Sequence, residues 1–502
     1  VMNVMEFDAV NLTTSQPETL RVSDGKGFRT RPTDPVPNAM VRGRLMQPYL
    51  LRRDLFEKAT TFGGVGMAKG EVLLQNADGQ LDYLLGYAFD GRQGRAWQGE
   101  DGAPFPGAWS RIGVCVVDTV SFDTDKVRLA LRDDLQTLNK PLLPNRFAGN
   151  NVLPAGLEGV ADLKDKPKPR LYGSVMNIAP KQVNTSKSIY QISDKACAVS
   201  AVFDRGIVLA LDAVASSKAD LEATVPAASS YRLWSGPDGT YVRLGTQAKG
   251  TVTVDASTTE TRAASLLQQI AGEMGLSAYA PDVAALNAAN SAAVGIWVDG
   301  DTTALTAMNE LASAVAASFY IDNLGRLRMA RLEAPAGPPV MTISSRMLIE
   351  LALISTADSD KGVPPWQVRL GYARNYTVQN DLAGGAGARV SWAAADYRRL
   401  TVDDTGVKTL HPNSEPMQVD TCLVNQADAQ AEAQRRLNLY KVGRQMFQIK
   451  AEFSPAQLAA LDLNQCVLLK HVRFGLTAGR LLRVVGMELN AELGEATLRL
   501  WG

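Results

Sequence analysis

The 502-residue sequence is poor in the residues that most often carry out chemistry in proteins. It contains only two histidines, His411 and His471, and neither has a partner suggested by its spacing. The commonest general base is therefore almost absent. The cysteines are Cys115, Cys197, Cys422 and Cys466. Because they lie far apart and form no Cys-X-X-Cys pair or Cys/His cluster, we expect buried reduced thiols and no metal site.

The sequence also lacks a charge excess and a long apolar run. Lysine plus arginine and aspartate plus glutamate number 52 each, so we expect no overall attraction to nucleic acid or to a membrane surface. No window reaches the roughly 18 apolar residues of a membrane span, and no charged-then-apolar signal peptide opens the sequence. We therefore expect a soluble protein made in the cytoplasm, with roughly three or four domains of ~100–200 residues each.

Residues 70–133 carry the clearest structural pattern in the chain. Val127, Leu129 and Leu131 alternate with other residues, which is the period of two expected for a half-buried strand. Asp-Gly pairs supply the residues that tolerate the dihedral angles of tight turns. Residues 81–85 predict one short amphipathic helix between the first strand and three later ones. Together these patterns predict a small β-barrel or sandwich with one helix packed on it.

Residues 363–502 show a similar pattern. Asn425 and Asp428 predict a capping box at the start of a helix that ends at Tyr440. Strands are expected at residues 366–372, 446–453, 465–471, 480–490 and 495–501. The C-terminal region is therefore predicted to form a second small β-barrel with one helix.

The predicted fold class is mainly β with α+β modules: two β-barrel or sandwich domains, each with a packed helix, and two inserted middle modules. The first 40 residues are rich in Thr, Ser, Asp and Pro. A segment of this composition predicts an extended arm, with one strand at most, that stays loose or lies against a neighbouring subunit. The predicted domains are an N-terminal arm (1–40), the first barrel (41–145), a mostly β middle module (146–255), an α/β middle module (256–335) and the second barrel (336–502).

Two short runs resemble anion-binding sequences only superficially. Residues 63–66 are rich in glycine, but they lack the Lys-Ser/Thr ending of a P-loop and do not fit a Gly-X-Gly-X-X-Gly pattern. Residues 164–170 are basic and rich in proline, and they are better explained as a solvated linker than as an anion site. Neither run is therefore predicted to bind phosphate.

Three segments carry a resemblance to a known family. They are VRGRLMQPYLLRRDLF…GEVLLQNADGQLDYLL near the N-terminus, LKDKPKPRLYGSVMNI…YQISDKACAVSAVFDRG in the centre and LLRVVGMELNAELGEATLRLWG at the C-terminus. These segments resemble the baseplate hub, or tail-tip hub, proteins of long-tailed bacteriophages. In that family two tail-tube-like barrels of one chain sit side by side, and three chains place six barrels in a ring that matches the hexameric tail tube. Some relatives carry a cysteine cluster for an iron–sulfur centre or a fused lysin or fibre, and this sequence shows neither.

The resemblance implies a structural virion protein rather than an enzyme, with no catalytic, cofactor-binding or metal-binding residues. The chain would form a homotrimer in the tail tip or baseplate and adapt the six-fold tube to a three-fold tip. Its implied partners are a ring of distal tail protein above, a central tail fibre or tip protein below, and the C-terminus of the tape measure protein in the channel. Sequence-specific binding of nucleic acid is not implied.

Two other functions remain open from the residues. The carboxylate pairs Asp133/Asp134 and Asp403/Asp404 could serve a cell-wall hydrolase or protease, although neighbouring residues on a strand face opposite sides. Tryptophans in loops could stack on sugars in a glycan-binding receptor module, although such residues are more often packing anchors. The tryptophans concerned are Trp97, Trp109, Trp234 and Trp392.

Overall fold

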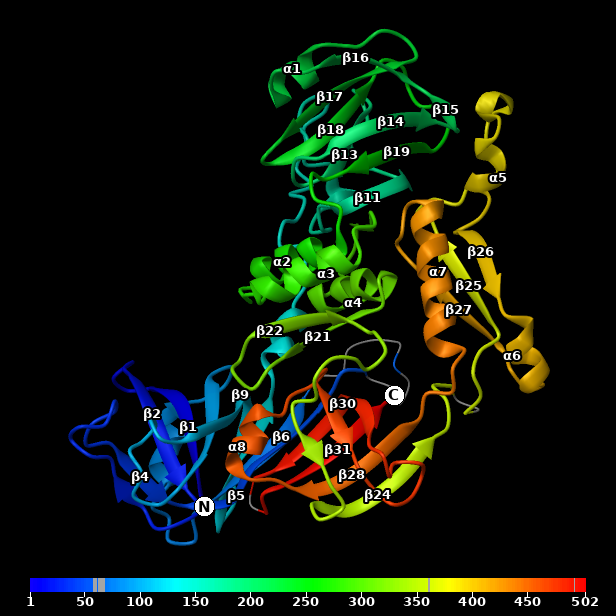
Figure 1. Cartoon of the computed structure of the whole chain (residues 1–502). Coiled ribbons are helices and arrows are strands. Elements are labelled where there is room, and N and C mark those ends of the chain that lie inside the picture. Colours follow the sequence, from blue (N-terminus) through cyan, green and yellow to red (C-terminus); the bar gives the residue numbers. More distant parts are fainter. Residues whose placement is uncertain (57–60, 62–67, 360–361, 492) are drawn as a thin grey trace.

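The computed structural model describes residues 1–56, 61, 68–359, 362–491 and 493–502, and the residues between these ranges are left aside. Strands predominate, and most of the helices lie in the middle of the molecule and along one side (Figure 1). The prediction of a mainly β fold with α+β modules is confirmed. Residues 63–66, the glycine-rich run, lie outside the described residues.

One 16-stranded sheet contains strands from both ends of the chain. Its N-terminal strands are β1 (Met2–Asn11), β2 (Pro17–Ser23), β3 (Phe28–Arg29), β4 (Met40–Gly43), β5 (Leu45–Asp54), β6 (Lys69–Gln75), β7 (Tyr87–Ala88), β8 (Gln93–Gly99), β9 (Ser110–Phe122) and β10 (Lys126–Arg132). Its C-terminal strands are β23 (Thr342–Ile343), β24 (Leu348–Ser355), β28 (Met446–Glu452), β29 (Cys466–Leu469), β30 (Arg480–Asn490) and β31 (Glu495–Trp501). The two groups lie side by side in Figure 1, so the ends of the chain build one continuous layer.

The extended arm predicted for residues 1–40 is wrong. Strand β1 lies inside the sheet, hydrogen-bonded to β8 on one side and to β2 on the other. Val4 and Phe7 are fully buried. The polar composition of the segment as a whole concealed one apolar strand, and an apolar strand that finds partners on both edges is ordered by them.

The short helix expected within residues 81–85 is present as a single turn of 3-10 helix, η1 (Asp82–Gly86). Leu81 and Leu84 are buried beneath it, whereas Leu85 is 65% exposed. A turn this short buries only one side, which explains why the third leucine stays outside.

The middle β module contains two five-stranded sheets, with strand orders β15-β14-β19-β11-β20 and β12-β13-β18-β17-β16. The strands are β11 (Arg170–Ile178), β12 (Lys181–Asn184), β13 (Ile189–Ser193), β14 (Ala198–Asp204), β15 (Ile207–Val208), β16 (Ala210–Val214), β17 (Ser230–Gly236), β18 (Gly239–Leu244), β19 (Val252–Ser257) and β20 (Gly295–Val298). The helices are the short 3-10 helix η3 (Ala161–Leu163) and α1 (Lys218–Ala223). Strand β20 comes from residues predicted to belong to the next module and pairs with β11. The two middle modules therefore interleave.

A layer of three helices lies between the middle β module and the large sheet (Figure 1). It contains α2 (Ala263–Glu273), α3 (Ala280–Ala289) and α4 (Ala304–Ala314), followed by the hairpin β21 (Ala317–Ile321) and β22 (Leu327–Arg331). Leu267 and Ile270 of α2 and Met308 of α4 are fully buried. The apolar faces of this layer and of the hairpin belong to the same core as the large sheet.

The region predicted as one second barrel is divided into two parts. Strands β25 (Gln367–Tyr372), β26 (Arg398–Asp403) and β27 (Pro416–Asp420) form a separate three-stranded sheet. The other elements of this region are η4 (Gly384–Ala386), α5 (Arg389–Ala393), α6 (Thr405–Leu410), α7 (Gln426–Tyr440) and α8 (Pro455–Ala460). Helix α7, predicted to pack on the second barrel, packs instead on β25 and β26 (Figure 1).

The start of α7 also differs from the prediction. The Asn425 side chain caps no backbone N–H of the helix and instead donates to the Asp428 carboxylate, Nδ2 to Oδ2, at 3.0 Å. A complete capping box occurs at α8, where Ser454 and Gln457 bond reciprocally. The spacing of three residues is the same at both sites. Only Ser454 places its side-chain oxygen on the third helical N–H, which is the contact a capping box requires.

Candidate functional site

Two sets of five strands repeat one topology within the large sheet. We call β5, β6, β8, β9 and β10 the N-repeat, and β24, β28, β29, β30 and β31 the C-repeat. The N-repeat has the order β5-β6-β10-β9-β8, and the C-repeat has the order β24-β28-β31-β30-β29. Every neighbouring pair in both repeats is antiparallel. The two repeats therefore have the same order and the same strand directions.

A β-bulge falls at the same place in both repeats. Between β9 and β10, Asp118 is skipped by the pairing. Between β30 and β31, Val485 is skipped by the pairing. A bulge places two residues of one strand opposite one of the other, so it gives an unambiguous point at which to align the repeats.

The alignment on the bulge matches buried positions as well as strands. It places Leu129 of β10 at the position of Leu498 of β31, and Leu131 at the position of Leu500. All four side chains are at most 2% exposed. The alternation that predicted the strands is thus the same alternation in both repeats, and it turns the same face inward.

The two repeats are joined by direct strand pairing. Strand β5 of the N-repeat pairs antiparallel with β30 of the C-repeat, from Gly486 opposite Asp54 to Asn490 opposite Leu50. We call this pairing the internal joint. An ion pair between Asp54 and Arg499 of β31 crosses it. Because main-chain hydrogen bonds and a cross-strand ion pair connect the repeats, they cannot separate without breaking the sheet.

A buried arginine ties the internal joint to the helical layer. Arg53 of β5 is 5% exposed, and its guanidinium donates to the Ile321 carbonyl at 3.0 Å and to the Asn323 side-chain oxygen at 2.6 Å. The same guanidinium lies 3.1 Å from the carboxylate of Asp462, which precedes β29. One side chain thus contacts the N-repeat, the C-repeat and the middle of the chain. Removing it would leave buried polar groups without this partner.

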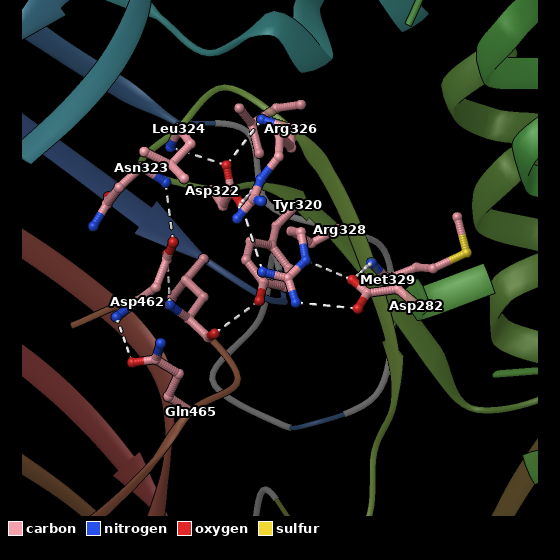
Figure 2. A network of polar contacts seen from close by, with 12 residues as sticks. Asp282, Tyr320, Asp322, Asn323, Leu324, Arg326, Arg328, Met329, Asp462 and Gln465 are labelled. Atoms are coloured by element: carbon pink, nitrogen blue, oxygen red, sulfur yellow. Dashed lines mark hydrogen bonds and ion pairs between the residues drawn. The ribbon is translucent and has the colours of Figure 1, made fainter. Parts of the chain in front are cut away.

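The tip of the β21–β22 hairpin completes this junction (Figure 2). Asn323 donates its backbone N–H to Asp462 at 3.0 Å and its side-chain amide to the Leu461 carbonyl at 2.9 Å. The Tyr320 hydroxyl donates to the Leu463 carbonyl at 2.9 Å. Burial raises the pKa of Tyr320 above its ordinary value, so the hydroxyl stays protonated and remains a donor.

The hairpin is fixed to α3 from its other side. Arg328 donates from Nε and Nη2 to the carboxylate of Asp282, at 2.6 and 3.1 Å (Figure 2). The carboxylate of Asp322 accepts the backbone N–H groups of Leu324 and Arg326, both at 2.9 Å, and shapes the turn. Two-point contacts between arginine and carboxylate fix orientation as well as distance. The junction is therefore a rigid mechanical connection among three parts of the chain.

The carboxylates considered for catalysis in the two Asp-Asp pairs lie in different surroundings. Asp133 is buried, its Oδ2 accepts the Ala68 N–H at 3.3 Å, and burial raises its pKa to about 7. Asp403 is exposed on β26. Asp404 caps α6 and pairs with Lys441 at 3.2 Å. Asp133 thus serves as a buried acceptor and Asp404 as a helix cap and ion-pair partner, which are structural contacts.

The four tryptophans take part in packing contacts. Trp109 and Trp392 are 7% and 8% exposed, which contradicts the exposure that stacking on sugars would require. The indole N–H of Trp97 donates to Glu6 at 3.0 Å, and the ring of Trp234 lies under the ammonium of Lys218. Indole rings that are buried, as in Trp109 and Trp392, or covered by another side chain, as in Trp234, are typical packing anchors. The structure therefore offers no open tryptophan platform at these four positions.

The basic run at residues 164–170 has two different parts. Lys164 and Lys166 are exposed, as expected for a solvated segment. Arg170, however, is 4% exposed and binds Asp194 at 2.6 Å and Glu273 at 2.9 Å. This pairing fixes the beginning of β11 to the helical layer, so the last residue of the run is structural.

The cysteine and histidine side chains, which could bind a metal or act as nucleophile or base, do not form a common site. All four cysteines are buried and unpaired by disulfides, as expected, and burial raises the pKa of Cys115 to about 12 and of Cys197 to about 11. His471 accepts the Arg473 N–H at its Nδ1, 3.2 Å away. Within the described ranges, no group of three or more His, Cys, Asp or Glu residues is placed to hold a metal ion. Among the same residues no helix has both the length and the apolar character of a membrane span.

Sequence reasoning missed the internal joint and the Arg53 junction. The available signal was weak: Arg53 precedes the buried Leu55 by two positions on an alternating segment, so it shares that inward side. A charged residue at an inward position requires a buried partner. The sequence could not show that this partner would be Asp462, because the two residues are far apart in the chain.

The sequence matches no protein-family profile and no curated protein. Solved structures that match this chain include a tail protein from Neisseria meningitidis, 9% identical over 100% of this chain and 96% of that one, with a TM-score of 0.41. Another is the 43 kDa tail protein of a prophage from Shewanella oneidensis, 10% identical over 99% of this chain and 98% of that one, with a TM-score of 0.41. A chain of a gene transfer agent virion is 14% identical over 67% of this chain and 84% of that one, with a TM-score of 0.44. Likeness at this level does not by itself assign a family or a function.

Proposed function

We propose that this chain is a structural protein of a bacteriophage tail, the hub of the tail tip or baseplate, and that three copies form a ring. The observation that carries the proposal is the repeat: one chain holds two five-stranded modules of equal topology, joined through one sheet. Three such chains supply six similar modules. A ring of this kind meets a six-fold tube on one side while retaining three-fold symmetry on the other.

The resemblance of the three sequence segments to tail-tip hub proteins supports the same function. It also supplies the proposed neighbours: a ring of distal tail protein above, a central fibre or tip protein below, and the tape measure protein in the channel. The middle β module projects away from the large sheet across the helical layer (Figure 1). It is thus suited to contact neighbouring tail proteins without disturbing the ring.

The internal joint explains how such a hub carries force. Its two repeats share main-chain hydrogen bonds, and Arg53 connects them to the hairpin that supports the helical layer. A load on the middle modules is therefore transmitted to both repeats. This role needs rigid connections and shape, and it requires no catalytic group.

The molecular mass in solution tests the proposal. Multi-angle light scattering of the purified chain is expected to give three chain masses, and electron microscopy is expected to show a ring of six similar lobes. A chain that stays monomeric at all concentrations and cleaves peptidoglycan would overturn the proposal in favour of a hydrolase. A monomer that binds cell-surface glycans would instead favour a receptor module.

A further inference from the structure

The repeat implies a second strand pairing, equivalent to the internal joint, that is not formed within one chain. Aligned on the shared bulge, β5 of the N-repeat corresponds to β24 of the C-repeat, and β30 corresponds to β9. The joint pairs β5 with β30. The corresponding strands β24 and β9 are not neighbours, because β24 is the end strand of the large sheet. Between them stand β28, β31, β30, β5, β6 and β10.

Both of these strands have an open edge. Within the part of the chain that the structure describes, β24 pairs with β28 and with no second strand. Over the same part of the chain, residues 118–122 of β9 pair with β10 alone, because β8 pairs with β9 only as far as Val116. In β30, the stretch that corresponds to residues 118–122 is the one that receives β5. Each chain thus has one free edge on β24 and one free edge on residues 118–122 of β9.

We propose that β24 of one copy pairs antiparallel with residues 118–122 of β9 in a second copy, in the geometry of the internal joint. The inference rests on the proposed ring and specifies the strands that close it. Because the two edges lie on different repeats, the contact is heterologous, and it closes when the rotation between copies is one third of a turn. Six modules would then follow one another through alternating internal and intermolecular joints.

The internal joint also fixes the register between copies. Leu51 corresponds to Leu353 through the pairs Leu51–Gly70–Leu131 and Leu353–Phe447–Leu500. Leu489, which lies opposite Leu51 in the internal joint, corresponds to Phe122 on β9. The next pair is Arg52 with Glu488, and its counterparts are Ser355 and Ser121. The proposed register therefore places Leu353 opposite Phe122, and Ser355 opposite Ser121.

The side chains at these positions fit the register. Residues directly opposite in an antiparallel pair lie on the same face. Phe122 and Leu353 are both half-buried and both pack against the main core, so both lie on the inner face. Ala352 and Asp123, the next opposite pair, are both exposed. The register therefore continues the inner apolar face from one copy to the next.

Strand β24 lacks the residues that protect an open sheet edge, as expected for an edge that another copy covers. Its sequence, Leu-Ile-Glu-Leu-Ala-Leu-Ile-Ser, contains no lysine or proline, and Ile349 and Ile354 are 45% and 46% exposed. Edges that remain open to water are usually protected by lysine, proline or inward charges. A second copy is the occupant that the repeat itself specifies, because the matching strand β5 already occupies that position within the chain.

Cysteine cross-linking in the full-length chain tests the register. Opposite residues of an antiparallel pair have Cα atoms about 4.5–5.5 Å apart, which permits a disulfide. Under mild oxidation, S121C/S355C is expected to form a covalent trimer on a non-reducing gel. The matched control S121C/I349C places the second cysteine roughly 20 Å along the same strand and is expected to give no covalent trimer. The native cysteines are all buried and do not compete.

Light scattering of the reduced proteins separates the proposed trimer from the proposed strand pairing. A trimer in which S121C/S355C cross-links and S121C/I349C does not supports the strand pairing. A trimer in which S121C/S355C fails to cross-link, or cross-links no more than the control, overturns the pairing and leaves the proposed hub standing. A chain that remains monomeric overturns both the ring and the pairing.

Discussion

The N-repeat and the C-repeat have one strand plan in two different surroundings. The N-repeat is extended at β8 by β1, β2, β4 and β3. Among the residues that the structure describes, the C-repeat has at the corresponding strand, β29, only the two-residue parallel strand β23. At the other side, β5 of the N-repeat is covered by β30, whereas β24 of the C-repeat ends the sheet. A repeated module thus acquires two roles from its neighbours, since the strand plan itself is unchanged.

The connections between strands are alike in one part of the two repeats and different in another. In each repeat a short helix follows the second strand along the chain: η1 lies between β6 and β8, and α8 lies between β28 and β29. Between β24 and β28, however, the chain leaves the sheet to build β25, β26, β27 and α7. The insertion changes what surrounds the repeat without shifting its register, because register is fixed by pairing and by the inward apolar face.

The largest expected effect comes from breaking the Arg53 junction, whose central side chain comes from the N-repeat. Arg53 follows Arg52 on β5, whereas the residue after the matching Ser355 is the exposed Thr356. We expect Arg53→Ala to lower the free energy of unfolding by about 3–5 kcal/mol, because Asp462 loses a buried partner. The control Arg52→Ala removes a side chain that is 60% exposed and is expected to cost under about 1 kcal/mol. Urea unfolding followed by tryptophan fluorescence measures both, and equal losses would contradict the role of Arg53.

Matched core truncations test whether the two repeats unfold as one body. Leu129 and Leu498 occupy the same aligned position and are 1% and 0% exposed. Each Leu→Ala change is expected to cost about 2–5 kcal/mol. Because both repeats belong to one sheet, each change is expected to lower the melting temperature of the same calorimetric transition. Two separate transitions, each affected by one variant alone, would show that the internal joint does not couple the repeats.

A pH-dependent difference is expected at the end of the last strand of each repeat. Asp133 follows β10, and the matching residue after β31 is Gly502. Burial raises the pKa of Asp133 to about 7, whereas the unfolded chain releases this proton near about pH 4. Asp133 therefore adds no penalty below about pH 4, and its ionisation destabilises the fold progressively as the pH rises to 7, by at most about 4 kcal/mol.

The variant Asp133→Asn removes this ionisation and retains an oxygen that can accept the Ala68 N–H. Relative to wild type, we expect it to be more stable at pH 8 and similar at pH 4. Melting temperatures measured across this range check the sign. A constant difference between the two proteins at every pH would contradict the raised pKa.

The smallest expected effect distinguishes the two bulged residues. Val485 is 3% exposed, so Val485→Ala is expected to cost about 2 kcal/mol from the two lost methyl groups. Asp118 occupies the matching bulge and pairs with Arg132 at 3.0 Å, with side chains 28% and 33% exposed. Asp118→Ala is expected to cost at most about 1 kcal/mol. Equal losses in denaturant titrations would show that the bulge, and not its surroundings, sets the cost.

Local pattern predicted many elements of this chain. The alternation of Val127, Leu129 and Leu131 identified β10, and the corresponding alternation near the C-terminus identified β31. The same reasoning failed for residues 1–40, where average composition outweighed the apolar segment that forms β1. It also assigned α7 to the wrong sheet. An amphipathic helix shows which of its faces is buried, but not which surface covers that face.

The sequence by itself determined the strands, the turns and the scarcity of groups able to perform chemistry. Only the tertiary structure decided that β5 pairs with β30, that Arg53 meets Asp462, and that β24 is left at the edge. The physical reason is the range of the interactions. Side-chain alternation is a property of neighbours in sequence, whereas strand partners depend on where the intervening chain returns. The repeat becomes visible only when those partners are known, and the open edges follow from it.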